Sequence, residues 1–149
     1  MKLVVRFRIR HPFFAALSAT PAMATRRRCT ALAGTFEELM EARRAGASAS
    51  RAIYVLRQPE CPFLGERERE ALWEAFQVPT LAVLAEGHHL VGYECEAQAG
   101  YHLGTTPLEI MPPGAAFEYA PCECGRPGRR LRPASAQCTA TATNESAQP

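Results

Sequence analysis

Residues 92–103 read Gly92-Tyr93-Glu94-Cys95-Glu96-Ala97-Gln98-Ala99-Gly100-Tyr101-His102-Leu103, and residues 121–125 read Pro121-Cys122-Glu123-Cys124-Gly125. Together the two stretches hold three thiols and one imidazole, in Cys95, His102, Cys122 and Cys124. Three cysteines and a histidine fill a tetrahedral zinc site and leave no coordination position open for a substrate. The sequence therefore predicts a structural zinc site around which the rest of the chain is organised.

The spacing Cys-x6-His-x19-Cys-x-Cys leaves two interpretations open. Cys95 and His102 flank an Ala99-Gly100 turn, which would direct both side chains toward one point. Gly125 lets the backbone turn sharply after the last thiol. Zinc-binding cysteines are more often about two to four residues apart than one, however. The alternative is a group of small buried cysteines beside a hydrogen-bonded histidine, and spacing alone does not decide between the two.

The composition excludes several classes of chemistry. The chain has 149 residues and 47 % hydrophobic content, enough for one domain with a core. Its one lysine is Lys2, and all of its acidic residues are glutamate. No lysine is therefore placed for a Schiff base or a phosphate-binding loop, and the lack of aspartate removes many phosphoryl-transfer designs. A net charge of +2 does not by itself indicate nucleic-acid binding.

Charge and composition divide the chain into three parts. Residues 1–30 carry arginines and no acid, and predict a basic, disordered extension. Arginines interrupt its apolar run, which argues against a signal peptide, and no run approaches the ~18 apolar residues of a membrane span. Residues 31–132 predict a single domain, with a metal-site subregion at 93–126. Residues 133–149 are rich in Ala, Thr, Ser and Gln and predict a disordered tail.

The hydrophobic pattern of residues 31–132 predicts a small α+β domain. A helix with a Thr35–Glu38 capping box is expected at 35–44, and a second helix with acids in its first turn at 65–76. A buried strand is expected at 52–56, with residues 45–50 as a loop. Strands at 80–84 and 90–95 would form a hairpin that delivers Cys95. Strands at 108–110 and 116–119, around Pro112-Pro113-Gly114, would form a second hairpin that leads to Cys122. Two helices would thus pack on short, mostly antiparallel strands, with a zinc-knuckle-like C-terminal part.

Other reactive side chains are interpreted as structural or as surface. Cys61 is expected to be a packing residue, because no neighbouring base is evident in the sequence to activate it. His88 and His89, at the tip of the first hairpin, are expected to be polar surface. The Glu/Arg run at 66–70 is expected to be a solvated helix face. No catalytic and no cofactor-binding residue is assigned, and the assigned site residues are the four metal ligands.

Residues 61–131 resemble part of the phenylacetate-CoA ligase family of adenylate-forming enzymes. The resemblance lies in Trp73-Glu74-Ala75-Phe76-Gln77-Val78-Pro79, in the stretch from Tyr93 to Leu103, and in Pro121-Cys122-Glu123-Cys124-Gly125. It implies the end of the large adenylation domain, where similar Cys and His positions look as though they bind a structural metal. The family's phosphate loop, Tyr-Gly-x-Thr-Glu segment, ribose-binding Asp and C-terminal domain with the catalytic Lys have no counterpart here.

Two functions of different class follow from these features. One is a small, zinc-stabilised, non-catalytic module that binds a protein partner. The other is a remnant or split subunit of an adenylate-forming acyl-CoA ligase. Thiols beside a histidine indicate metal binding in a reducing compartment, so the cytoplasm is the expected location. No membrane association is expected, and nucleic acid would be contacted only weakly, through the arginines of residues 1–30.

Overall fold

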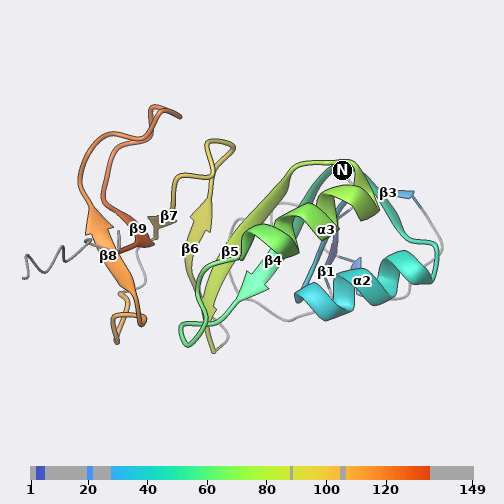
Figure 1. Ribbon diagram of the computed structural model, residues 1–149, viewed down its shortest axis with the longest axis horizontal. Coiled ribbons are helices and arrows are strands. Elements are labelled where there is room, and N and C mark those ends of the chain that lie inside the picture. Colours follow the sequence, from blue (N-terminus) through green and yellow to red (C-terminus); the bar gives the residue numbers. More distant parts are fainter. Residues whose placement is uncertain (1–2, 6–19, 22–27, 88, 105–106, 135–149) are drawn as a thin grey trace, which may run out of the picture.

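The computed structural model describes residues 3–5, 20–21, 28–87, 89–104 and 107–134. The described chain forms two helices on one side of a sheet whose strand order is β2-β1-β3-β4-β5-β6-β7-β9-β8. In Figure 1 the helices lie beside the N-terminal half of the sheet, and strands β8 and β9 lie at its far end. The elements are β1 (Leu3–Val5), β2 (Thr20–Pro21), β3 (Arg28–Gly34), α2 (Phe36–Arg44), β4 (Ser48–Arg57), α3 (Glu66–Phe76), β5 (Thr80–Glu86), β6 (His89–Glu94), β7 (Tyr101–Leu103), β8 (Ala115–Glu118) and β9 (Arg130–Pro133).

The helix at 35–44 begins with the capping box that the sequence predicts, and the helix at 65–76 begins with a cap that was not predicted. Thr35 accepts a hydrogen bond from the backbone N–H of Glu38, and the Glu38 carboxylate accepts one from the backbone N–H of Thr35, which completes a capping box. At α3 the Glu68 carboxylate accepts the backbone N–H of Gly65 at 2.9 Å. Helix α3 ends at Phe76, because the next residue, Gln77, has a φ of 56° and leaves the helical region.

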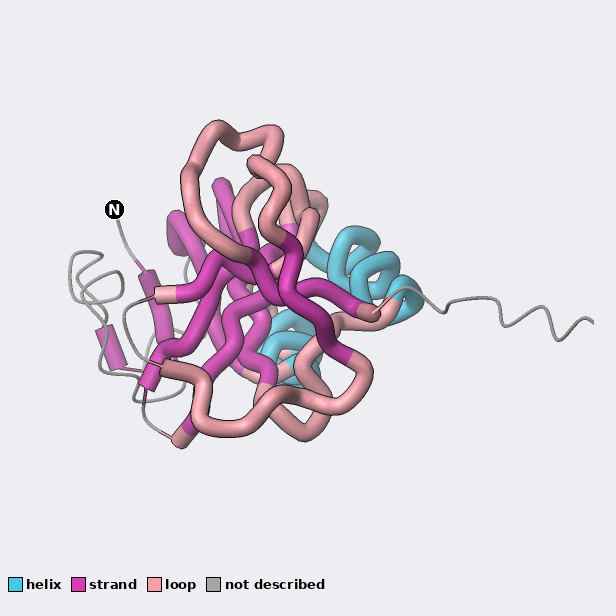
Figure 2. The backbone as a smooth tube through the Cα atoms, turned by 90° about the vertical axis from the view of Figure 1, so that its left-hand side faces the viewer, coloured by secondary structure: helices cyan, strands magenta, loops and turns pink. Residues whose placement is uncertain are grey.

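The helices cover one face of the parallel part of the sheet. Strands β3, β4 and β5 run parallel, and each crossover between them contains one helix. Leu39 of α2 and Leu72 of α3 are fully buried against Ile53 and Val55 of β4. Figure 2 shows both helices together on the same side of the strands. Burial of this apolar surface is the main favourable free energy that holds the two layers together.

The C-terminal part of the sheet is antiparallel and carries the Cys and His residues. Strands β5, β6, β7, β9 and β8 pair in that order. Among strands β3 to β9, four of the six neighbouring pairs are antiparallel. The predicted α+β domain with two helices on short, mostly antiparallel strands is therefore confirmed, and so is the β5–β6 hairpin.

The second predicted hairpin is wrong. Residues 108–110 are not a strand, and β8 pairs instead with β9, where Phe117 lies opposite Leu131. Ile110 is 72 % exposed, so residues 108–110 bury little apolar surface that would hold them beside β8. Leu131 is fully buried between Tyr101 of β7 and Phe117 of β8, so β9 occupies the place expected for 108–110. The loop predicted at 45–50 is also shorter, because β4 already begins at Ser48.

Several predictions concern residues that lie wholly or partly outside the described ranges. The extension at 1–30 is described only at residues 3–5, 20–21 and 28–30, where backbone strands β1, β2 and the start of β3 lie. The tail at 133–149 is described only at residues 133–134, and His88 is not described. The boundary at 31–132 stays a prediction. Neither helix of the described ranges is long and apolar enough to cross a bilayer.

Candidate metal centre

Strands β6 and β7 place Cys95 and His102 side by side. Tyr93 pairs with His102 across the antiparallel ladder, and Cys95 directly follows the last residue of β6. The chain reverses between them in a turn closed by the Gln98 N–H, which donates to the Cys95 carbonyl at 2.9 Å. Gln98 and Gly100 both have positive φ, of 50° and 98°. This turn brings the thiol and the imidazole to the same end of the two strands, as the sequence predicts.

Cys122 and Cys124 lie in the loop between β8 and β9. The Gly125 N–H donates to the Cys122 carbonyl at 2.9 Å, and Gly125 has a φ of 78°. This tight turn holds the two thiols on neighbouring positions of one loop. The loop returns to the first pair of ligands because His102 of β7 pairs directly with Arg130 of β9.

The four side chains converge on one point. The Cys95 and Cys122 sulfurs are 3.6 Å apart, and the Cys124 sulfur is 3.4 Å from His102 Nε2. All four ligand atoms lie within 4.8 Å of one another. Tetrahedral ligands about 2.0 to 2.3 Å from a shared ion are about 3.5 to 3.8 Å apart. The group is therefore close enough to bind a metal ion, with an inward movement of about 1 Å for the most separated pair.

The thiols are free, and the surroundings of the imidazole favour its neutral form. The 3.6 Å sulfur separation is far longer than a disulfide bond of about 2.05 Å. Cys95, Cys122 and His102 are buried, whereas Cys124 is exposed. Burial, and then the charges of Arg126 and Arg130, lower the pKa of His102, which favours the neutral form that binds metals.

The pKa values of two of the thiols move in opposite directions. Burial raises the pKa of the Cys95 thiol to about 11. The backbone N–H of Cys124, followed by weaker contacts with the neighbouring thiols and Arg130, lowers the pKa of Cys122. Cys122 therefore loses its proton more readily than Cys95. A bound cation would favour the thiolate form of both residues, since metal ligation requires it.

Arg130 ties the two halves of the site together. Its side chain is buried, and it donates to the Ala99 carbonyl at 2.7 Å and to the Ala120 carbonyl at 3.1 Å. The first carbonyl belongs to the turn between Cys95 and His102, and the second lies two residues before Cys122. A second cation, Arg126, lies 5.4 Å from the Tyr93 ring centroid. The charges of Arg126 and Arg130 both act on His102, so two cations lie near a cluster that would carry three thiolates.

The other candidate residues lie apart from this cluster. Cys61 is exposed, and its sulfur accepts a hydrogen bond from Arg57 at 3.0 Å, so it is less of a packing residue than expected. His89 is exposed at the start of β6, consistent with polar surface. In the part of the chain that the structure describes, Cys95, His102, Cys122 and Cys124 form the only group of three or more side chains suited to a metal.

Sequence reasoning missed a polar contact beside the site. The Glu94 carboxylate is buried, accepts the Ala82 N–H at 2.8 Å and forms an ion pair with Arg69 of α3. Glu68 of the same helix forms an ion pair with Arg57 at 3.1 Å. The Glu/Arg run at 66–70 is therefore only partly a solvated face. The Glu/Arg pattern of residues 66–70 did not predict this contact. Alternating charges on an amphipathic helix do not indicate which of them a distant strand will contact.

No protein-family model and no curated protein matches this chain. The geometry of the described residues is therefore what supports a functional assignment.

Proposed function

We propose that this chain is a zinc-stabilised, non-catalytic module, related to a piece of a phenylacetate-CoA ligase-like adenylation domain, that acts by binding a protein partner. The observation that carries the proposal is the convergence of Cys95, His102, Cys122 and Cys124 within 4.8 Å. These residues come from two segments that are separated by 19 residues in the chain and meet through β7 and β9. Such convergence of soft ligands is typical of a structural metal site.

The donor set favours zinc. Zn²⁺ is a borderline-soft ion that binds thiolates and imidazoles well. It has no geometric preference of its own, so it accepts the tetrahedral arrangement of three thiolates and an imidazole. Four protein ligands leave no open position for substrate, which favours a structural role. A zinc ion with three thiolates carries a net charge of about −1, and the nearby Arg126 and Arg130 offset that charge.

The non-catalytic role rests on what the sequence lacks. Adenylation needs groups that hold phosphates and Mg²⁺, usually a donor-rich loop with a lysine or an aspartate. The chain has no aspartate, and its one lysine is Lys2. A binding role draws support from large apolar side chains on the surface. Trp73, Ile110, Met111 and Tyr119 are all exposed, Ile110 and Tyr119 to 72 %.

Metal analysis of purified protein tests the zinc assignment. We expect about one zinc per chain in wild type, and loss of zinc in the Cys122→Ser/Cys124→Ser double variant. Metal binding supplies on the order of 10 kcal/mol in small zinc modules, so the variant should also lose stability in β7, β8 and β9. Cys61→Ser is the matched control, and it should retain zinc. Stoichiometric zinc in the double variant, or none in wild type prepared without chelator, contradicts the proposal.

A nucleotide titration and an adenylation assay test the non-catalytic role. We expect no tight ATP binding and no pyrophosphate release from ATP with aryl or fatty acids. Pyrophosphate release by the isolated chain would show that it is an enzyme. Release that needs a second polypeptide would support the split-ligase alternative instead.

A further inference from the structure

The loop between β8 and β9, residues 119–129, buries little apolar surface. Cys122 is its only buried residue. The arginines of the loop make cation–π contacts with rings of β6 and β8, and such contacts are weak at exposed sites. A segment with few buried contacts opens at a low cost in free energy, so its position can adjust. Cys124, which this loop carries, can therefore move relative to the strands more easily than a ligand on a buried segment.

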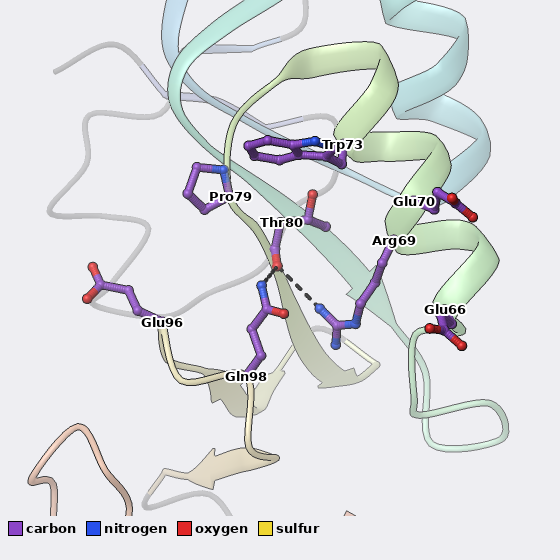
Figure 3. A pocket seen from close by; sticks show the side chains of 8 residues that line it. All are labelled: Glu66, Arg69, Glu70, Trp73, Pro79, Thr80, Glu96 and Gln98. Atoms are coloured by element: carbon purple, nitrogen blue, oxygen red, sulfur yellow. Dashed lines mark hydrogen bonds between the residues drawn. The ribbon is translucent and has the colours of Figure 1, made fainter.

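The turn between β6 and β7 is held more firmly. The Gln98 amide donates to the Thr80 carbonyl of β5 at 3.1 Å, and Arg69 of α3 donates to the same carbonyl at 3.3 Å, as Figure 3 shows. Cys95 and His102, at the two ends of this turn, are both buried. One half of the metal centre is thus fixed to the sheet, and the half on the β8–β9 loop is adjustable.

Cys124 is also the metal ligand that is open to solvent. Cys95 and Cys122 are 5 % exposed and His102 is 4 % exposed, whereas Cys124 is an exposed residue. Its sulfur lies 3.4 Å from His102 Nε2, so it belongs to the same cluster. A bound metal keeps its ligand cysteines as thiolates, and an accessible thiolate is the form of cysteine that a peroxide oxidises. An oxidant therefore meets the centre at Cys124 first.

We propose that Cys124 is an oxidation site through which a peroxide displaces the metal and joins Cys124 to Cys95 in a disulfide. The Cys124 thiolate attacks the peroxide, so that an S–O bond forms, the O–O bond breaks and hydroxide leaves. The Cys95 thiolate then attacks the Cys124 sulfur, so that an S–S bond forms, the S–O bond breaks and a second hydroxide leaves. The two sulfurs supply the two electrons that reduce the peroxide.

The geometry favours Cys95 as the second sulfur. All four ligand atoms lie within 4.8 Å of one another, and a disulfide bond is about 2.05 Å long, so the loop needs to move by less than about 3 Å. Cys122 is a poorer partner, because only one residue separates it from Cys124 and the small ring leaves little freedom for the narrow geometry that a disulfide requires.

Formation of this disulfide removes two of the four metal ligands. His102 and Cys122 remain, and two ligands are too few for a structural zinc site, so the ion leaves. A small thiol reductant reverses the change, because it supplies two electrons that break the S–S bond and restore both thiols. This inference deepens the proposed zinc module and rests on it, since it states how the metal content of the site is regulated.

Peroxide-driven zinc release from the full-length, zinc-loaded protein tests the proposal. A colorimetric chelator follows the released ion after hydrogen peroxide is added. We expect release of the zinc, a Cys95–Cys124 disulfide in the mass spectrum of the digested product, and renewed zinc binding after treatment with a thiol reductant and zinc. Cys61 is exposed, so its oxidation shows that the peroxide is active. Retention of zinc while Cys61 is oxidised, or a disulfide that excludes Cys124, overturns the proposal.

Two variants locate the point of attack. Cys124→His keeps four ligands and removes the exposed thiolate, so it should bind zinc and release it to peroxide at least about tenfold more slowly. Cys61→Ser is the matched control, because it removes an exposed thiol that lies apart from the cluster, and it should release zinc at the wild-type rate. Equal rates in Cys124→His and wild type, or a slower rate in Cys61→Ser, refute Cys124 as the site.

Alkylation of the wild-type protein gives an independent answer if Cys124→His does not hold zinc. The zinc-loaded protein is treated with a small amount of N-ethylmaleimide, and mass spectrometry compares the three ligand cysteines. Cys124 should be modified at least about tenfold faster than Cys95 and Cys122, because it is exposed and they are buried. Equal modification of the three residues contradicts the proposal.

The metal analysis keeps this proposal separate from the proposed function. Wild-type protein that holds no zinc overturns the zinc module itself. Wild-type protein that holds zinc, but is not oxidised through Cys124, leaves the zinc module intact and overturns only the oxidation site.

Discussion

Substitution of Gly100 by alanine should destabilise the C-terminal part of the sheet. Gly100 has a φ of 98°, and a Cβ added there would lie 2.6 Å from the Leu131 carbonyl oxygen and 2.5 Å from Arg132 Cγ. The Arg132 side chain can move away, but Leu131 is fixed because β9 pairs with β7 on one side and with β8 on the other. Relief of the clash therefore requires β7 and β9 to separate.

Two contributions make up the loss of unfolding free energy expected for Gly100→Ala. A left-handed backbone costs an alanine about 1–2 kcal/mol. Overpacking against a fixed strand adds about 1–3 kcal/mol, so Gly100→Ala should lose about 2–5 kcal/mol of unfolding free energy. Gly128 provides the matched control, because its φ is 103° and an added Cβ would meet no atom within 4 Å. Gly128→Ala should therefore lose only the backbone contribution of about 1–2 kcal/mol.

Urea unfolding of the two variants and wild type, followed by circular dichroism, measures these free energies. Competition with a chelator supplies a second readout, because β7 carries His102 and β9 closes the loop that carries Cys122. Gly100→Ala should release metal at a lower chelator concentration than Gly128→Ala. If the two variants lose the same free energy, the close approach of Gly100 to β9 does not determine the stability of this region.

Two further predictions concern the core and the first helix. Tyr101 is fully buried, its hydroxyl donates to the Pro62 carbonyl, and burial followed by the charge of Glu94 raises its pKa. Above about pH 10 the unfolded chain loses this proton while the folded chain keeps it, so stability should fall by up to about 1.4 kcal/mol per pH unit. Tyr101→Phe should remove that part of the loss of stability at alkaline pH, and it should cost about 1–3 kcal/mol of stability at neutral pH. Urea unfolding at several pH values checks both expectations. An unchanged slope of stability against pH in the alkaline range would contradict the assignment to Tyr101. Thr35→Ala should cost about 0.5–2 kcal/mol of stability through loss of the α2 cap, whereas Thr35→Ser keeps the hydroxyl and should stay near wild type. Thermal unfolding measures both variants, and equal losses of stability would exclude a role for the hydroxyl.

The sequence by itself determined the features that depend on near neighbours. The cap of α2 joins Thr35 to Glu38, three residues away, and the cap of α3 joins Gly65 to Glu68 at the same spacing. The turns at Gly100 and Gly125, which orient the Cys and His side chains, likewise depend on a few adjacent residues. Such interactions recur in any chain with the same local pattern, because they join groups that the backbone already holds close. The resemblance to adenylate-forming ligases stays a prediction of the sequence.

The tertiary structure decided the features that join distant segments. Strand β9 reads Arg-Leu-Arg-Pro and gives little local indication of a strand, yet it lies between β7 and β8. Arg69 reaches Glu94 across 25 residues, and Arg130 reaches the Ala99 carbonyl across 31. Many pairings of that separation are compatible with the same charges, and only the burial of Leu131 and Tyr101 in one core selects among them. For the same reason, the spacing of the Cys and His residues left two interpretations open, and their convergence became evident only when β9 was placed beside β7.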